Sequence, residues 1–116
     1  MENKSDAKLL RIFIGESDNL GNRPLYEAIV FEAKKEGLSG ATVTKGIMGF
    51  GANSKINSSK LFTISQDFPL IVEIVDVDNK IRNFIEIVEQ MFEKSNSGGL
   101  ITIEKAEIIT YKALKK

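Results

Sequence analysis

Glycines cluster at two places in this 116-residue sequence where backbone amides could bind an anion. The first is residues 46–51 (GIMGFG), and the second is Ser97-Gly98-Gly99. Because glycine accepts positive φ angles, successive N–H groups in such turns can form a concavity that binds phosphate. Neither run has the spacing of a Walker loop or of a dinucleotide-binding fingerprint. Spacing alone favours a turn that shapes a long hairpin at the first run and a helix stop at the second.

Side chains for catalysis are few. The sequence contains no Cys and no His, which removes the thiol nucleophile, the thiolate metal site and the commonest general base. Carboxylates remain: we expect Asp76 and Asp78 to cap a helix and Glu16 and Asp18 to be solvated in a loop. An enzyme that uses a carboxylate-bound metal, such as Mg²⁺ at the 76–78 pair, is a lower-ranked alternative. The expectation is therefore a protein that is not an enzyme.

Composition points to a protein that does not bind nucleic acid. The 16 basic and 16 acidic residues give a net charge of zero, which provides no attraction for a phosphate backbone. The strands also lack paired aromatic residues on one face, which argues further against the hypothesis that the sheet binds RNA. No apolar run has the length of a membrane span and residues 1–8 do not resemble a signal peptide, so we expect a cytoplasmic location.

Periodicity predicts one α+β domain with the ferredoxin-like order βαββαβ, in which a four-stranded antiparallel sheet carries two helices on one face. We expect residues 1–7 to be disordered, the domain to span residues 8–112, and residues 113–116 to form a basic tail. The last strand loses its alternation near Lys105 and Ala106, which predicts a bulge or break there. The predicted strands are 9–16, 42–47, 70–75 and 100–111, with a short returning strand at 60–65, and the predicted helices are 24–35 and a second one through residues 81–92.

The strand at residues 70–75 (LIVEIV) is apolar on both faces. Leu70, Val72 and Ile74 share one face, whereas Ile71 and Val75 point the other way. Both helices belong to the same face, so the second face would leave an apolar patch in water. Self-association through the sheet is the preferred interpretation. The alternative is that the loop at residues 46–59 folds back over this face.

Several runs resemble a known family. Residues 37–44 (GLSGATVT), followed by Gly49-Phe50-Gly51, resemble the second strand and loop entry of nitrogen-regulatory PII proteins, and Phe68-Pro69 with the next strand resembles their third strand. The match is closer to a PII-like family, domain of unknown function 190. It rests on residues 11–18 (RIFIGESD), 24–28 (PLYEA) and 46–51.

The resemblance implies a homotrimer whose sheets face inward and whose intersubunit clefts bind an adenine nucleotide. It also implies that the loop at residues 46–65 contacts a protein partner, for which a membrane transporter is the implied class. An interaction trimer without a ligand, acting as an accessory to a membrane ion transporter, is the alternative. By position, the implied ligand-binding residues are Gly40, Thr42, Gly49, Phe50, Gly51, Asn53, Val75, Gly98, Gly99 and Lys112.

The nucleotide expected from this resemblance carries few phosphates. An Arg-Gln pair of PII proteins is replaced by Ala52-Asn53, and their arginine-rich C-terminal segment by Thr110-Tyr111-Lys112. The second glycine turn also lacks the lysines of PII proteins. Because a triphosphate would lose several charge-assisted contacts, AMP or ADP is expected in preference to ATP. From the residues alone, Phe50 is expected to pack against the core.

Overall fold

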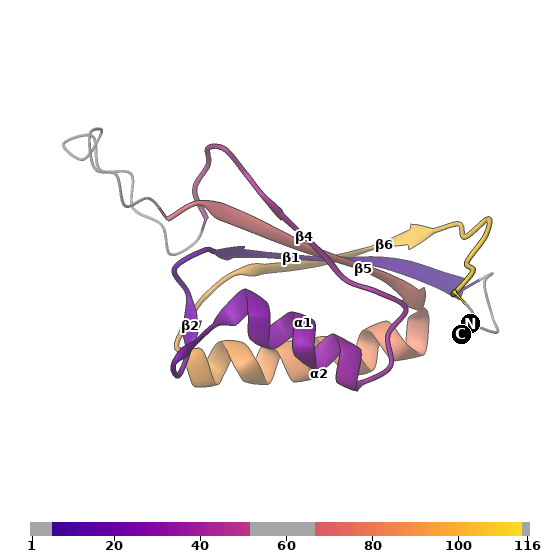
Figure 1. The fold of residues 1–116 in the computed structure, drawn as a ribbon, viewed down its shortest axis with the longest axis horizontal. Helices are drawn as coiled ribbons and strands as arrows, with labels where there is room; N and C mark the ends of the chain where they lie inside the picture. Colours follow the sequence, from indigo (N-terminus) through magenta and orange to yellow (C-terminus); the bar gives the residue numbers. More distant parts are fainter. Residues whose placement is uncertain (1–5, 52–66, 115–116) are drawn as a thin grey trace.

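Two helices cover one face of a four-stranded antiparallel sheet in this computed structural model, which describes residues 6–51 and 67–114 (Figure 1). The sheet has the order β4-β5-β1-β6. The predicted ferredoxin-like class is therefore confirmed. In chain order, the elements are β1 (Ala7–Gly15), β2 (Asn19–Leu20), β3 (Arg23–Pro24), α1 (Leu25–Lys35), β4 (Thr42–Lys45), β5 (Pro69–Val77), α2 (Asp78–Ser95) and β6 (Leu100–Ala106).

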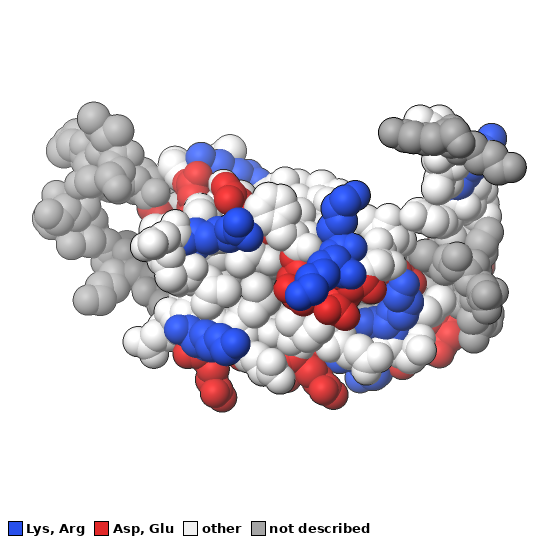
Figure 2. Space-filling model, turned by 60° about the horizontal axis from the view of Figure 1, so that its bottom comes forward, with Lys and Arg blue, Asp and Glu red and all other residues white. Residues whose placement is uncertain are grey.

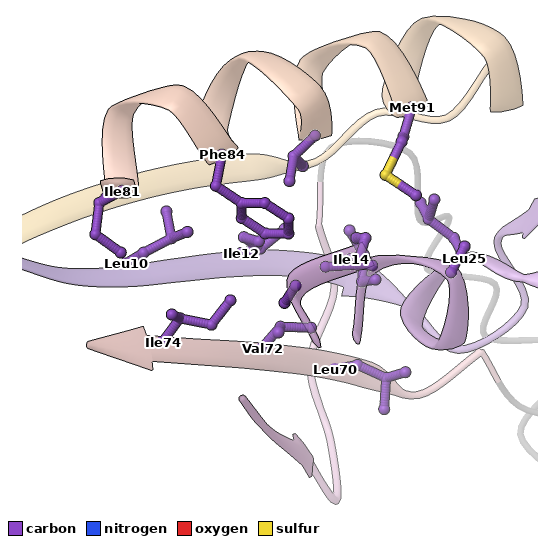
Figure 3. Packing of buried hydrophobic residues seen from close by; sticks show 14 residues of the cluster. Leu10, Ile12, Ile14, Leu25, Leu70, Val72, Ile74, Ile81, Phe84 and Met91 are labelled. Atoms are coloured by element: carbon purple, nitrogen blue, oxygen red, sulfur yellow. The ribbon is translucent and has the colours of Figure 1, made fainter. Parts of the chain in front are cut away.

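The core lies between the sheet and the two helices (Figure 3). Strands β1 and β5 pair in a register that sets Ile12 opposite Val72, and both side chains are fully buried. Helix α2 faces them with residues spaced three or four apart, the period of one helix face. The core cluster on this side of the sheet comprises Leu10, Ile12, Ile14, Leu70, Val72 and Ile74 from the strands, Leu25, Ala28, Ile29 and Ala33 from α1, and Ile81, Phe84, Val88 and Met91 from α2.

Element boundaries differ from the sequence prediction at several places. Strand β1 begins at Ala7, which is buried, so the predicted disorder does not reach this residue. Strand β4 ends at Lys45 rather than at Ile47, because the chain bends at Ile47 and Met48. Strand β6 ends at Ala106, where its alternation was expected to break. The returning strand predicted at residues 60–65 lies outside the described residues.

The segment before α1 contains a short hairpin that the sequence did not reveal. Strands β2 and β3 pair Asn19 with Pro24 and Leu20 with Arg23, although this stretch was expected to be an irregular polar loop. Gly21, at φ +64°, supplies the tight turn between them. The hairpin thereby leads the chain directly into α1.

The ends of α2 use different groups from those expected. Helix α2 begins without a side-chain cap, so the predicted capping by Asp76 or Asp78 is wrong. Asp76 instead accepts hydrogen bonds from the N–H groups of Ser39 and Val77, and Asp78 is the first residue of the helix. At the other end, Asn96 takes the left-handed conformation at φ 56° and stops the helix before the glycine turn.

Asp78 has two cationic partners, which makes its contribution to stability depend on pH. Its carboxylate lies 3.3 Å from Lys8 Nζ and 3.0 Å from Arg82 Nε. Desolvation opposes ionisation, but the hydrogen bonds from Lys8 and Arg82 outweigh it and lower the pKa of Asp78. A carboxylate whose pKa is lower in the folded state stabilises the fold above its unfolded pKa, and this contribution is lost as the pH falls through the folded value.

We therefore expect Asp78→Asn to lower the free energy of unfolding at neutral pH, and the difference from wild type to shrink as the pH falls below about 4. Denaturation by urea over a pH series measures this. Glu89→Gln, a change on the exposed side of the same helix, controls for removing one carboxylate. A difference for Asp78→Asn that stays constant down to acid pH would contradict the assignment.

Candidate functional site

The loop between β4 and β5 is closed at its base by backbone contacts. Gly46 N–H donates to the carbonyl oxygen of Pro69 at 2.7 Å, and Glu16 N–H donates to that of Phe68 at 2.8 Å. Gly49 has φ +151°, and a Cβ atom there would lie 3.2 Å from Pro69 Cγ. A larger residue at Gly49 would therefore be strained by its backbone and crowded by Pro69.

The two glycine turns meet at this end of the sheet, which we call the loop end. Gly99 packs so closely that a Cβ atom would lie 2.7 Å from the carbonyl oxygen of Phe13 and 2.9 Å from Phe92 Cζ. Only glycine fits without displacing the backbone. A cavity of about 350 Å³ separates the turns, lined by Phe13, Ile14, Gly15, Asp18, Phe50, Gly51, Asp67, Pro69, Gly98, Gly99 and Leu100.

The described residues around this cavity carry acidic but no basic side chains. Asp18 Oδ2 accepts a hydrogen bond from Gly15 N–H, and Asp67 Oδ1 accepts one from Ser17 N–H, each at 2.9 Å. Asp18 was expected to be a solvated loop residue, but its carboxylate also stabilises the turn that begins at Gly15. Two carboxylates at the wall disfavour a ligand with several negative charges.

Phe50 does not pack against the core, so that prediction is wrong. Its side chain is 69% exposed, and Ile47 and Met48 are 93% and 88% exposed. The reason is that β4 ends at Lys45 and the chain bends at Ile47 and Met48, so these side chains lie beyond the end of the strand. Three large apolar side chains in one exposed turn indicate a surface that contacts another molecule.

A second group of predicted site residues lies around Ser39, which we call the Ser39 end. Thr42 pairs with Glu73 of β5, and Val75 pairs with Leu9 of β1. Ser39 Oγ donates to the carbonyl oxygen of Val75. A cavity of about 400 Å³ opens here, lined by Ser39, Val75, Glu107, Ile108, Ile109, Thr110 and Tyr111.

Sequence reasoning missed Ser39 and Tyr111 as members of this end. Tyr111 Oη donates to the carbonyl oxygen of Ser39 at 3.0 Å, a contact between residues 72 positions apart. The one available sequence signal was Asp76, a carboxylate directly after an apolar strand. Asp76 is only 3% exposed, and such a buried carboxylate requires nearby donors.

The structure does not bring all ten predicted ligand residues together in one copy of the chain. Pro69 at the loop end and Val75 at the Ser39 end are six residues apart along β5, a separation of about 20 Å. Lys112 is exposed next to Tyr111, and Asn53 lies outside the described residues. The loop end holds Gly49, Phe50, Gly51, Gly98 and Gly99, whereas the Ser39 end holds Gly40, Thr42 and Val75 and leads to Lys112.

The sheet face opposite the helices, which we call the open face, is partly apolar. As predicted, Ile71 and Val75 lie on this face, while Leu70, Val72 and Ile74 are buried under the helices. At its centre, Arg11 Nε lies 2.8 Å from a Glu73 oxygen and Arg11 Nη1 lies 3.2 Å from one of Glu104. These ion pairs are flanked by the partly exposed apolar residues Leu9, Phe13, Ile71, Val75 and Leu100.

The helical side has a different surface. Basic and acidic side chains are interspersed over the face shown in Figure 2.

Among residues 6–51 and 67–114, neither helix combines the length and apolar composition needed to cross a bilayer. The same described part of the chain contains no cluster of three or more His, Cys, Asp or Glu side chains that could hold a metal ion.

The order of the elements, with a glycine loop leading out of β4, is the fold of PII-like proteins. CPII from Thiomonas intermedia K12, solved with ADP and bicarbonate, matches with a TM-score of 0.63 and 14% identity over 88% of this chain and 87% of that one. CPII has also been solved with ADP, AMP and bicarbonate. A PII-like signaling protein from Thermus thermophilus matches with a TM-score of 0.60 and 15% identity over 86% of each chain. At these identities the likeness establishes the fold.

The family follows from sequence comparison. The model of domain of unknown function 190, described as "Uncharacterized ACR", matches residues 7–108, and the chain belongs to this family. A UPF0166 protein of Aquifex aeolicus (strain VF5) is 40% identical over 102 residues, which are 88% of this chain and 92% of that protein. A UPF0166 protein of Methanocaldococcus jannaschii is 33% identical over 88% of this chain and 91% of its own length.

Proposed function

We propose that this chain is a cytoplasmic, ligand-sensing regulatory protein that binds an adenine nucleotide in clefts between the subunits of a homotrimer. The observation that carries the proposal is the division of the predicted ligand residues between the loop end and the Ser39 end. A cleft between two copies can combine the loop end of one with the Ser39 end of the next. Each end has its own cavity, of about 350 Å³ and 400 Å³, which supports this arrangement.

The open face supports the trimer. A face that places Ile71 and Val75 beside Leu9 and Phe13 gains free energy when another copy removes it from water. The paired Arg11 and its two glutamates would supply polar contacts at the centre of such an interface.

The acidic wall of the loop end supports a nucleotide of low charge. With Asp18 and Asp67 at this wall, AMP or ADP is expected to bind more tightly than ATP. CPII, which shares the fold, has been solved with ADP and with AMP. Calorimetry of the intact oligomer against AMP, ADP and ATP tests the proposal, and absence of binding to all three would contradict it.

Gly40 gives a test that leaves the fold intact. A Cβ atom at Gly40 meets nothing within 4 Å in a single copy, so Gly40→Ala should fold normally, and light scattering checks that it also assembles. If Gly40 approaches the ligand, the added methyl group should weaken ADP binding about tenfold. Gln90→Ala, on the exposed side of α2, is the control. Unchanged ADP affinity in Gly40→Ala would contradict the assignment of Gly40 to the ligand site.

A second candidate function is favoured by the exposed turn at Ile47, Met48 and Phe50. In that case the trimer acts only through protein contacts, as an accessory to a membrane ion transporter, with the loop at residues 46–65 as its docking surface. Gly51→Ala separates the two functions, because a Cβ atom there also meets nothing within 4 Å. Nucleotide binding by the wild type that is lost in Gly51→Ala, with partner binding retained, supports a sensor, whereas a wild-type trimer that binds no nucleotide and still binds its partner supports the accessory role.

A further inference from the structure

Residues 37–41 connect α1 to β4 without forming a helix or strand of their own. Gly37 and Leu38 still bond to the last turn of α1 through their N–H groups. Beyond that turn, the loop is held by two side chains from a different part of the chain, Asp76 at the end of β5 and Lys80 in α2. We call these two side chains the clasp.

The Asp76 carboxylate uses each of its oxygens on a different backbone N–H group. Oδ2 accepts a hydrogen bond from Ser39 N–H at 2.9 Å, and Oδ1 accepts one from Val77 N–H at 2.7 Å. Asp76 is only 3% exposed, so the protein itself must supply the donors. Asparagine has a single acceptor oxygen, and its NH₂ group would face the second backbone N–H. The position therefore requires a carboxylate rather than any polar side chain.

Lys80 reaches the same loop from the first turn of α2. Its Nζ donates to the carbonyl oxygen of Gly37 at 2.6 Å and lies 3.9 Å from Asp76 Oδ2. The ammonium group therefore bridges the loop and the carboxylate, and its charge offsets part of the cost of burying that carboxylate. The clasp thus holds the loop at two backbone atoms, the N–H of Ser39 and the carbonyl oxygen of Gly37.

A cavity of about 640 Å³ lies beside the clasp, lined by residues 37–39 and 76–80 with Asp6 and Tyr111. Close packing does not fix the loop on this side, so its position there depends on the polar contacts. Gly40 and Thr42, which follow directly, are exposed. A segment with few buried contacts opens easily when such polar contacts are lost. The clasp therefore controls how often Gly40 and Thr42 occupy their present positions.

We propose that Asp76 and Lys80 are positioning residues of the nucleotide site, because the clasp holds the loop that presents Gly40 and Thr42 to the ligand. Both side chains act through the loop, since their polar atoms are engaged with its backbone. The role in ligand binding rests on the function proposed above, whereas the clasp is a property of the unliganded chain. The apparent affinity for ADP falls in proportion to the fraction of chains in which the clasp is closed.

Lys80→Met tests the clasp, because it removes the ammonium group at a position where the side chain is 41% exposed and keeps a long side chain there. Lys94→Met, the same change at an exposed position near the other end of α2, is the matched control. Lys80→Arg restores a cationic donor. The first readout is hydrogen exchange of the Ser39 amide without nucleotide, measured by NMR, and the second is calorimetric titration with ADP.

We expect the Ser39 amide to exchange about 3- to 10-fold faster in Lys80→Met and ADP to bind more weakly by a similar factor. Lys80→Arg should restore most of both properties, and Lys94→Met should change neither. Asp76→Asn should loosen the loop further, because it leaves one buried N–H group without an acceptor. Lys80→Met decides the outcome if Asp76→Asn does not fold.

The two readouts separate failure of the clasp from failure of the proposed function. Exchange of the Ser39 amide at the wild-type rate in Lys80→Met would overturn the clasp. Faster exchange with unchanged ADP affinity would overturn the positioning role, while nucleotide binding by the wild type would stand. Absence of ADP binding by the wild type would overturn the proposed function and the positioning role together, and the exchange rates would still decide whether the clasp exists.

Discussion

Replacement of Ile71 by aspartate is expected to separate the proposed trimer into folded monomers that lack the proposed nucleotide cleft. Ile71 lies on the open face, where it pairs with Phe13 on one side and with Thr44 on the other. In a monomer the new carboxylate would contact water, so the core beneath β5 should remain intact. In an interface it would be buried beside apolar side chains without a partner, at a cost of several kcal/mol.

Light scattering measures the outcome for Ile71→Asp. We expect the mass to fall to about one third of the wild-type value, with unchanged circular dichroism and no heat on addition of ADP. Phe31→Asp places the same charge at a 53% exposed position on the helical side and should leave the mass unchanged. A wild-type protein that is monomeric across working concentrations, or an Ile71→Asp variant that keeps the full mass, would contradict assembly through the open face.

Removal of the Phe84 ring should cause the largest loss of stability among the substitutions considered. Phe84 is 1% exposed and packs from α2 onto the sheet (Figure 3). Truncation of such a residue to alanine costs about 3–5 kcal/mol, because it removes apolar contacts and leaves a cavity. This is a large fraction of the roughly 5–15 kcal/mol typical for the unfolding of a domain.

Urea denaturation of Phe84→Ala and wild type at equal protein concentration measures this loss, since the stability of an oligomer depends on concentration. Phe31→Ala is the matched control, because Phe31 is exposed and contacts Arg23, whose guanidinium lies 4.8 Å from the ring centre. We expect that variant to lose less than about 1 kcal/mol. Equal losses in the two variants would show that the core does not depend on Phe84 as described.

The parts of the fold that the sequence predicted are those governed by local periodicity. The spacing of six residues indicated one buried face of a helix: Ile81, Phe84, Ile85, Val88, Met91 and Phe92. Four of them are buried, and Ile85 and Phe92 are partly buried against the core. The two-sided character of β5 could be predicted from its alternation, because side chains on a strand point to opposite faces. The break in alternation near Ala106 marked the end of β6.

The remaining features depend on contacts between residues distant in sequence. Asp76 was expected to cap α2, but its carboxylate binds the amide of Ser39, which lies 37 positions earlier. Phe50 was expected in the core, but it follows a bend at Ile47 and Met48 and is exposed. Of the candidate site, the glycines were assigned through the family resemblance and not through their spacing, whereas the contact between Tyr111 and Ser39 has no local signature.

The hydrogen bonds at the base of the loop explain how this fold can change what it recognises. Gly46 and Pro69 join through backbone atoms, as do Glu16 and Phe68, so these bonds do not depend on the side chains between residues 52 and 66. Substitutions, insertions or exchanges in that stretch can therefore accumulate while the sheet keeps its geometry. Residues 52–66 can therefore change in evolution independently of the sheet, and a foreign recognition sequence could be grafted in their place.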